Sequence, residues 1–110
     1  MAITLSDVVH GMTNPDALTP RNVFEYMSWM AAEYSRLHVE AAEAQILRGQ
    51  HEASLIRDGQ TAAGARTLAA VSDVGIAETR LRAALKSHEE MIRALKKMGA
   101  YLSEESRNQY

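Results

Sequence analysis

The chain has 110 residues, a formal net charge of −2 and no cysteine. This length suits one domain. The lack of cysteine excludes a disulfide scaffold, a thiol nucleophile and thiolate metal sites, and it fits a reducing compartment. Neither a signal peptide nor an apolar run of the roughly 20 residues that cross a bilayer is visible. We therefore expect a cytoplasmic protein without a membrane partner.

Residues 1–18 are expected to form a short N-terminal helix and a turn. The composition is rich in Ala, Glu, Arg and Leu and shows no sustained period-two alternation, so the fold class is predicted to be all-α. Thr4 and Asp7 have the spacing of a capping box, which predicts a helix that stops near Gly11. The run 13–16 then predicts a turn.

Residues 19–59 are expected to form the first long helix. Thr19-Pro20 is a capping hydroxyl followed by proline at the first helical position, and Gly59 supplies a stop after about Asp58. Such a helix is roughly 58 Å long, so an elongated molecule is expected. Steps of three and four predict one buried stripe along it: Val23, Met27, Met30, Tyr34, Leu37, Ala41, Ala44, Leu47, His51 and Leu55.

Residues 60–110 are expected to hold a short Ala-rich segment and a C-terminal heptad helix. The helix is predicted from Ser72 or Ile76 to near Ser103, followed by a frayed polar tail at 106–110. Gly75 either breaks the chain before this helix or lies within one continuous helix.

A heptad seam runs along this last helix through Leu81, His88, Leu95 and Leu102. It predicts an elongated antiparallel helical hairpin that resembles a coiled coil. Aromatics make up only 5% of the chain, so the core is thin, and we expect a homo-oligomer completed along the seam. His88 either fixes the register of this seam or forms a pH-sensitive contact.

The sequence shows no constellation that supports catalysis. No Glu lies three residues before any of the four histidines, as helical metal sites require, and the six glycines are scattered. We therefore expect no enzyme, no metal, no cofactor and no small-molecule substrate.

Basic residues lie along the outward face of the last helix: Arg80, Arg82, Lys86, Arg93, Lys96 and Lys97. They form either an ordinary solvated face or a set of contacts to phosphates. No aromatic residue is interleaved before Tyr101, so base stacking is not predicted along this stripe.

Phe24, Tyr26 and Trp29 cluster at the start of the first long helix. They are either a second packing face for the N-terminal helix or a partner-binding surface, for which Trp and Tyr are favoured. The second alternative predicts a structural, adaptor or inhibitor protein, such as a virion component or an anti-host factor.

Residues 20–105 resemble the small phage-encoded recombination mediators of the UvsY type. The resemblance rests on a Tyr-containing first helix (24–26 to 34–38), a polar break (57–60) and a charged heptad helix (78–82 through 93–97). It implies a homo-oligomeric ring that holds single-stranded DNA while a recombinase replaces single-strand-binding protein. Single-stranded DNA and a recombination protein are then the expected partners, with the six cations named above facing phosphate.

Overall fold

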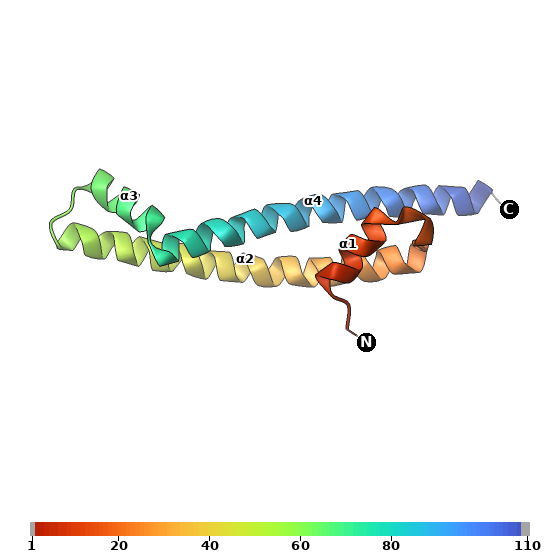
Figure 1. The fold of residues 1–110 in the computed structure, drawn as a ribbon, viewed down its shortest axis with the longest axis horizontal. Coiled ribbons are helices and arrows are strands. Elements are labelled where there is room, and N and C mark those ends of the chain that lie inside the picture. Colours follow the sequence, from red (N-terminus) through yellow and green to blue (C-terminus); the bar gives the residue numbers. More distant parts are fainter. Residues whose placement is uncertain (1, 109–110) are drawn as a thin grey trace. The chain divides into compact units, whose positions relative to one another are not determined.

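The computed structural model describes residues 2–108, and this part of the chain is helical without a strand. The elements are α1 (Leu5–Thr13), a short 3-10 helix η1 (Pro15–Ala17), α2 (Pro20–Arg57), α3 (Ala62–Val71) and α4 (Asp73–Asn108) (Figure 1). The predicted all-α class is confirmed. No helix in this range is apolar enough over a sufficient length to cross a membrane.

The chain divides into two compact units. The first unit comprises residues 1–34 and 87–110, and the second comprises residues 35–86. Each unit therefore contains part of α2 and part of α4.

In the first unit, α1 and η1 pack against the two long helices. The buried core contains Val8, Leu18, Val23, Met30 and Leu95. Thr4 caps α1 by accepting a hydrogen bond from the Asp7 amide, while the Asp7 carboxylate accepts one from the Thr4 amide, so the predicted capping box is confirmed. α2 and α4 run antiparallel here, with Gly99 close to the side chain of Val23.

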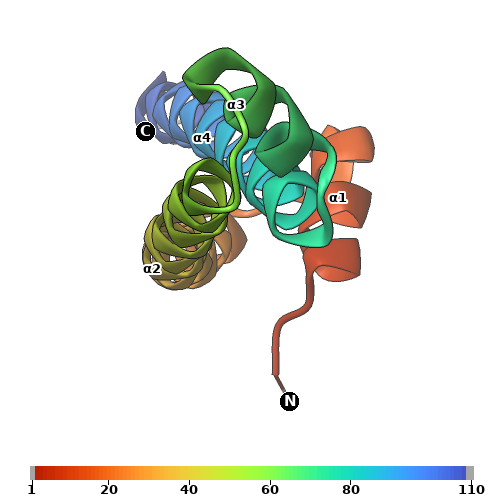
Figure 2. The same ribbon diagram turned by 90° about the vertical axis from the view of Figure 1, so that its left-hand side faces the viewer.

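The second unit contains three helical segments, α3 and parts of α2 and α4 (Figure 2). Its buried apolar residues are Leu37, Ala41 and Ala44 of α2 and Ala65 and Ala69 of α3. The small alanine side chains let the helices approach closely, but they bury little apolar area.

Both ends of α2 are capped by the residues that the sequence predicts. The Thr19 hydroxyl accepts a hydrogen bond from the Asn22 amide at 3.1 Å. At the other end, the amides of Gly59 and Gln60 donate to the carbonyls of Ile56 and Leu55, each at 3.0 Å. This pair of bonds is a Schellman motif, and it requires the positive φ of Gly59, which is 102°.

The junction between α3 and α4 lies at Ser72. This residue is extended, with ψ 166°, and its hydroxyl accepts a hydrogen bond from the Gly75 amide in the first turn of α4. Gly75 thus lies inside α4 and does not form the break. A Cβ at Gly75 would lie 2.2 Å from the Ala69 carbonyl oxygen, so the glycine permits this close approach.

Several predicted boundaries need correction. α1 continues past Gly11 to Thr13, and α4 continues past Ser103 to Asn108, which shortens the predicted frayed tail. Residues 109–110 lie outside the described range. Propensity changes gradually at helix ends, so such boundaries are weakly encoded.

The buried stripe of α2 also departs from the prediction. Leu47 and His51 are exposed, whereas Arg48 and Glu52 are partly buried. A straight α-helix has about 3.6 residues per turn, whereas steps of three and four average 3.5. Over several turns, residues chosen by such steps therefore move away from the side of α2 that contacts the other helices.

Candidate nucleic-acid interface

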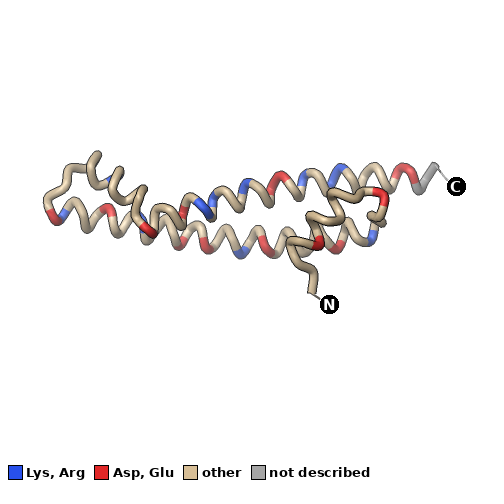
Figure 3. The backbone as a smooth tube through the Cα atoms, in the orientation of Figure 1, with Lys and Arg blue, Asp and Glu red and all other residues tan. Residues whose placement is uncertain are grey.

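The predicted basic residues divide between the two units along α4 (Figure 3). In the second unit, Arg82 is engaged within the protein: it donates to Gln45 of α2 at 2.8 Å and pairs with Glu78 at 3.1 Å. Arg80 and Lys86 are exposed and form no ion pair with any residue that the structure describes. Two of these three cations are therefore free to meet an external anion.

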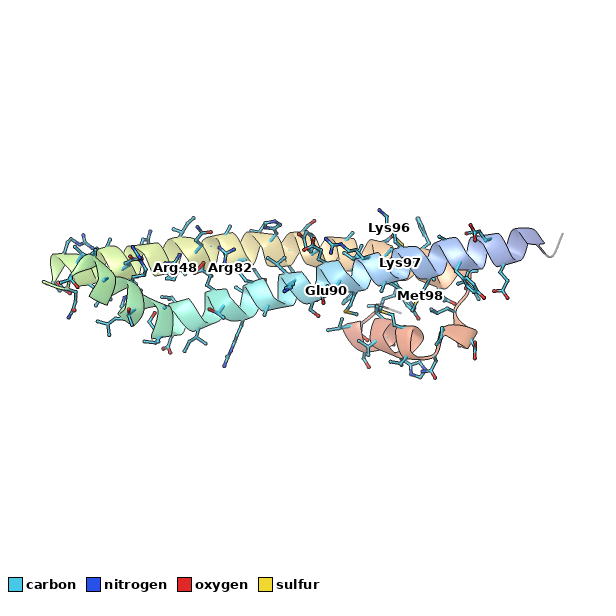
Figure 4. All side chains as sticks on the ribbon, turned by 90° about the horizontal axis from the view of Figure 1, so that it is seen from above. Arg48, Arg82, Glu90, Lys96, Lys97 and Met98 are labelled. Carbon is cyan, nitrogen blue, oxygen red and sulfur yellow. The ribbon has the colours of Figure 1, made fainter. Side chains whose placement is uncertain are left out.

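In the first unit, Arg93 pairs with Glu89 at 2.8 Å, one turn earlier on α4. Lys96 and Lys97 are exposed and make no ion pair within residues 2–108. Lys96 extends away from α1, whereas Met98 lies on the side of α4 that faces α1 (Figure 4). Lys96 is thus an exposed, unpaired cation on the side of α4 away from α1.

A pocket of about 550 Å³ adjoins Lys97 in the first unit. Its walls come from η1 and its neighbours and from the end of α4: Pro15, Asp16, Leu18, Lys97, Met98, Tyr101, Leu102 and Glu105. The carboxyl-bearing residues Asp16 and Glu105 line this pocket together with Lys97.

In the second unit, Glu78 of α4 is buried beside Arg48 of α2, and the pKa values of both groups are shifted. The hydrogen bond from the Arg48 guanidinium lowers the pKa of Glu78, and Arg82 acts in the same direction against the opposing effect of burial. The same bond raises the pKa of Arg48 above its ordinary value. Arg48 also pairs with Glu52 at 3.3 Å. The network holds α2 against α4 and leaves Glu78 ionised.

The three aromatic residues have different environments. Tyr26 and Trp29 are partly buried and pack against the core of the first unit, and Gly11 of α1 lies against the Tyr26 ring. Phe24 is 71% exposed. Tyr26 and Trp29 thus contribute to the packing face for the N-terminal helix, and Phe24 is the member that faces solvent.

The seam residues of α4 are covered within a single chain. Leu95 is fully buried among Val8, Leu18, Val23 and Met30, and His88 is also buried. Leu81 and Leu102 are half-buried, each in its own unit. The heptad pattern therefore serves packing inside the chain.

Residues 2–108 contain no group of three or more His, Cys, Asp or Glu side chains arranged to hold a metal ion.

The sequence interpretation missed Gln45, Arg48 and Glu78. Glu78 lies three residues before the seam position Leu81, where a charge is ordinarily solvated, and its partner Arg48 is 30 residues away in the chain. One feature of the sequence could have predicted this pair. Arg48 lies next to the apolar stripe of the first long helix, and the antiparallel last helix carries an acid, Glu78, that can face it.

No family model, curated protein or solved structure matches this chain. The structure thus defines a class, an all-α protein of two helical units.

Proposed function

We propose that this chain is a non-enzymatic helical accessory protein that holds single-stranded nucleic acid through α4, in the manner of a recombination mediator. The observation that carries the proposal is the set of exposed cations on one helix that form no ion pair within the described residues: Arg80, Lys86, Lys96 and Lys97. A cation already paired with a carboxylate gains little from phosphate, whereas a free one releases a counterion from the nucleic acid.

Two of the six acids of α4 are paired within the protein. Glu78 and Glu89 are each paired with arginines, which reduces their repulsion of a phosphate backbone. Glu90 is exposed between the two groups of cations. The mediator role itself rests on the resemblance described above.

The test is fluorescence anisotropy of a labelled oligothymidine at salt concentrations from 50 to 200 mM. For single strands the slope of log K against log salt is about −0.7 per phosphate contact, so four contacts give about −2.8. The Lys96→Gln/Lys97→Gln variant is expected to reduce the slope by about 1.4.

Arg21→Gln is the matched control. Arg21 is an exposed cation on α2 that already pairs with Glu25 at 3.1 Å. It is expected to leave both the affinity and the slope unchanged. If the double lysine variant behaves like this control, the α4 cations form only a solvated face.

A second candidate, a protein-binding adaptor, is favoured by the exposure of Phe24. An aromatic side chain on the surface is a common contact residue in protein interfaces. Under this alternative, Phe24→Ala abolishes binding of a partner captured by the wild-type chain while helicity is retained. Trp29→Ala is a poorer test because Trp29 packs against the core. Retention of the partner by Phe24→Ala would exclude this surface.

A further inference from the structure

α2 carries a second apolar stripe in the second unit, on a different side from its buried residues. The stripe advances in alternating steps of three and four, with Val39, Ile46 and Ala53 at one set of heptad positions and Ala42, Gly49 and Ile56 at the other. None of the six is charged, and all six are exposed; Val39 and Ile46 are each 60% exposed. Such a heptad stripe is the pattern by which one helix packs along another.

Gly49 lies in the middle of this stripe and has no role inside the chain. A Cβ at this position would have no atom within 4 Å. Glycine destabilises a helix relative to alanine, and no close packing around Gly49 in the single chain requires it. A second helix lying against the stripe would use the missing side chain for a close approach.

The core of the second unit also points to a further packing surface. Its buried apolar residues are one leucine and four alanines, while Val39, Ile46 and Ile56 face solvent. Small cores of this kind are ordinarily completed by association.

The charged residues that flank the stripe favour a second copy of this chain as its binding partner. In a parallel, in-register pair of two α2 helices, the flanking positions bring Glu52 opposite Arg57, His38 opposite Glu43, and Gln45 opposite Gln50 of the second copy. Each pair is neutral or attractive, and within the chain Gln45 also accepts a hydrogen bond from Arg82 and Glu52 also pairs with Arg48. Glu43 and Arg57 form no ion pair within the described residues, so both are available.

The flanking charges do not fix the direction of the second helix. The antiparallel alignment that places Glu52 opposite Glu52 also brings Glu43 opposite Arg57 on both sides of the pair. A second copy of the chain therefore meets opposite charges in either direction.

We propose that two copies of this chain associate through residues 39–56 of α2 as a two-helix pair. The surface is separate from the α4 cations, so the proposal does not depend on nucleic-acid binding.

The test is the mass of the full chain by light scattering over a range of concentrations. The wild-type chain is expected to dimerise, and Ile46→Glu, which places two like charges in the centre of the stripe, is expected to give a monomer with unchanged helicity by circular dichroism. Leu47→Glu is the control, because Leu47 is similarly exposed at 52% but lies outside the stripe. It is expected to remain dimeric. A monomeric wild-type chain, or an assembly whose mass Ile46→Glu leaves unchanged, overturns the proposal.

Discussion

Glu78 of α4 is buried and accepts a hydrogen bond from Arg48 of α2. The carboxylate lies beside the alanine core of the second unit, where an unpaired charge would be costly. A shifted register between the two helices would separate it from Arg48. The pair therefore opposes alternative registers that the small alanine side chains would tolerate.

Removing the charge of Glu78 is expected to destabilise the protein. Glu78→Gln keeps the shape but weakens the bonds from Arg48 and Arg82, and the expected loss is about 1–3 kcal/mol of unfolding free energy. Urea denaturation followed by circular dichroism measures it. Glu89→Gln is the control, since its pair with Arg93 is exposed and contributes less than about 1 kcal/mol. Equal losses in the two variants would show that Glu78 has no special role.

The same pair predicts a pH dependence. The pKa of Glu78 is lowered in the folded state from its ordinary value of 4.5. A lowered folded-state pKa stabilises the protein above pH 4.5 and loses that contribution as the pH falls through the folded value. Urea midpoints of the wild type and Glu78→Gln are expected to differ at pH 7 and to converge below pH 4.5. A constant difference down to pH 3 would contradict this.

The first unit has a core of larger apolar side chains, and Leu95 is the residue of α4 that is fully buried in it. The side chain is fully buried among residues of α1, α2 and the segment after η1. Leu95→Ala is expected to cost about 2–5 kcal/mol, from lost burial and the resulting cavity. Leu102→Ala, at a half-buried position of the same heptad register, is expected to cost less. Thermal unfolding of both variants makes the comparison.

The helix starts and stops were predictable where a side chain or glycine acts on its own backbone. Three such signals act on backbone groups only a few residues away: Thr4 with Asp7, Thr19 with Pro20, and Gly59. Their effect can therefore be predicted from the sequence. Ser72 was harder, because a serine can cap a helix or lie inside one. The choice depends on how α3 packs against the neighbouring helices.

The candidate site was predictable only as a set of residue types. The outward position of the α4 cations follows from the heptad pattern, and Arg80, Lys86, Lys96 and Lys97 are indeed exposed. Which cations are already paired depends on contacts such as Arg82 with Gln45, across 37 residues of chain. Such pairings follow from the register between helices, which periodicity alone leaves open.

The junction between α3 and α4 depends on Gly75. A methyl group there would lie 2.2 Å from the Ala69 carbonyl oxygen and 2.6 Å from that of Ala70, and both are backbone atoms that cannot rotate away. Gly75→Ala is therefore expected to displace α3 and to cost about 1–3 kcal/mol, despite the better helix propensity of alanine. Ile76→Ala, at the next and more exposed position, is expected to cost less. Urea denaturation of the two variants measures the difference, and hydrogen exchange is expected to show faster exchange confined to α3 and the first turn of α4 in Gly75→Ala. A Gly75→Ala variant as stable as the wild type would mean that α3 is not held in this position.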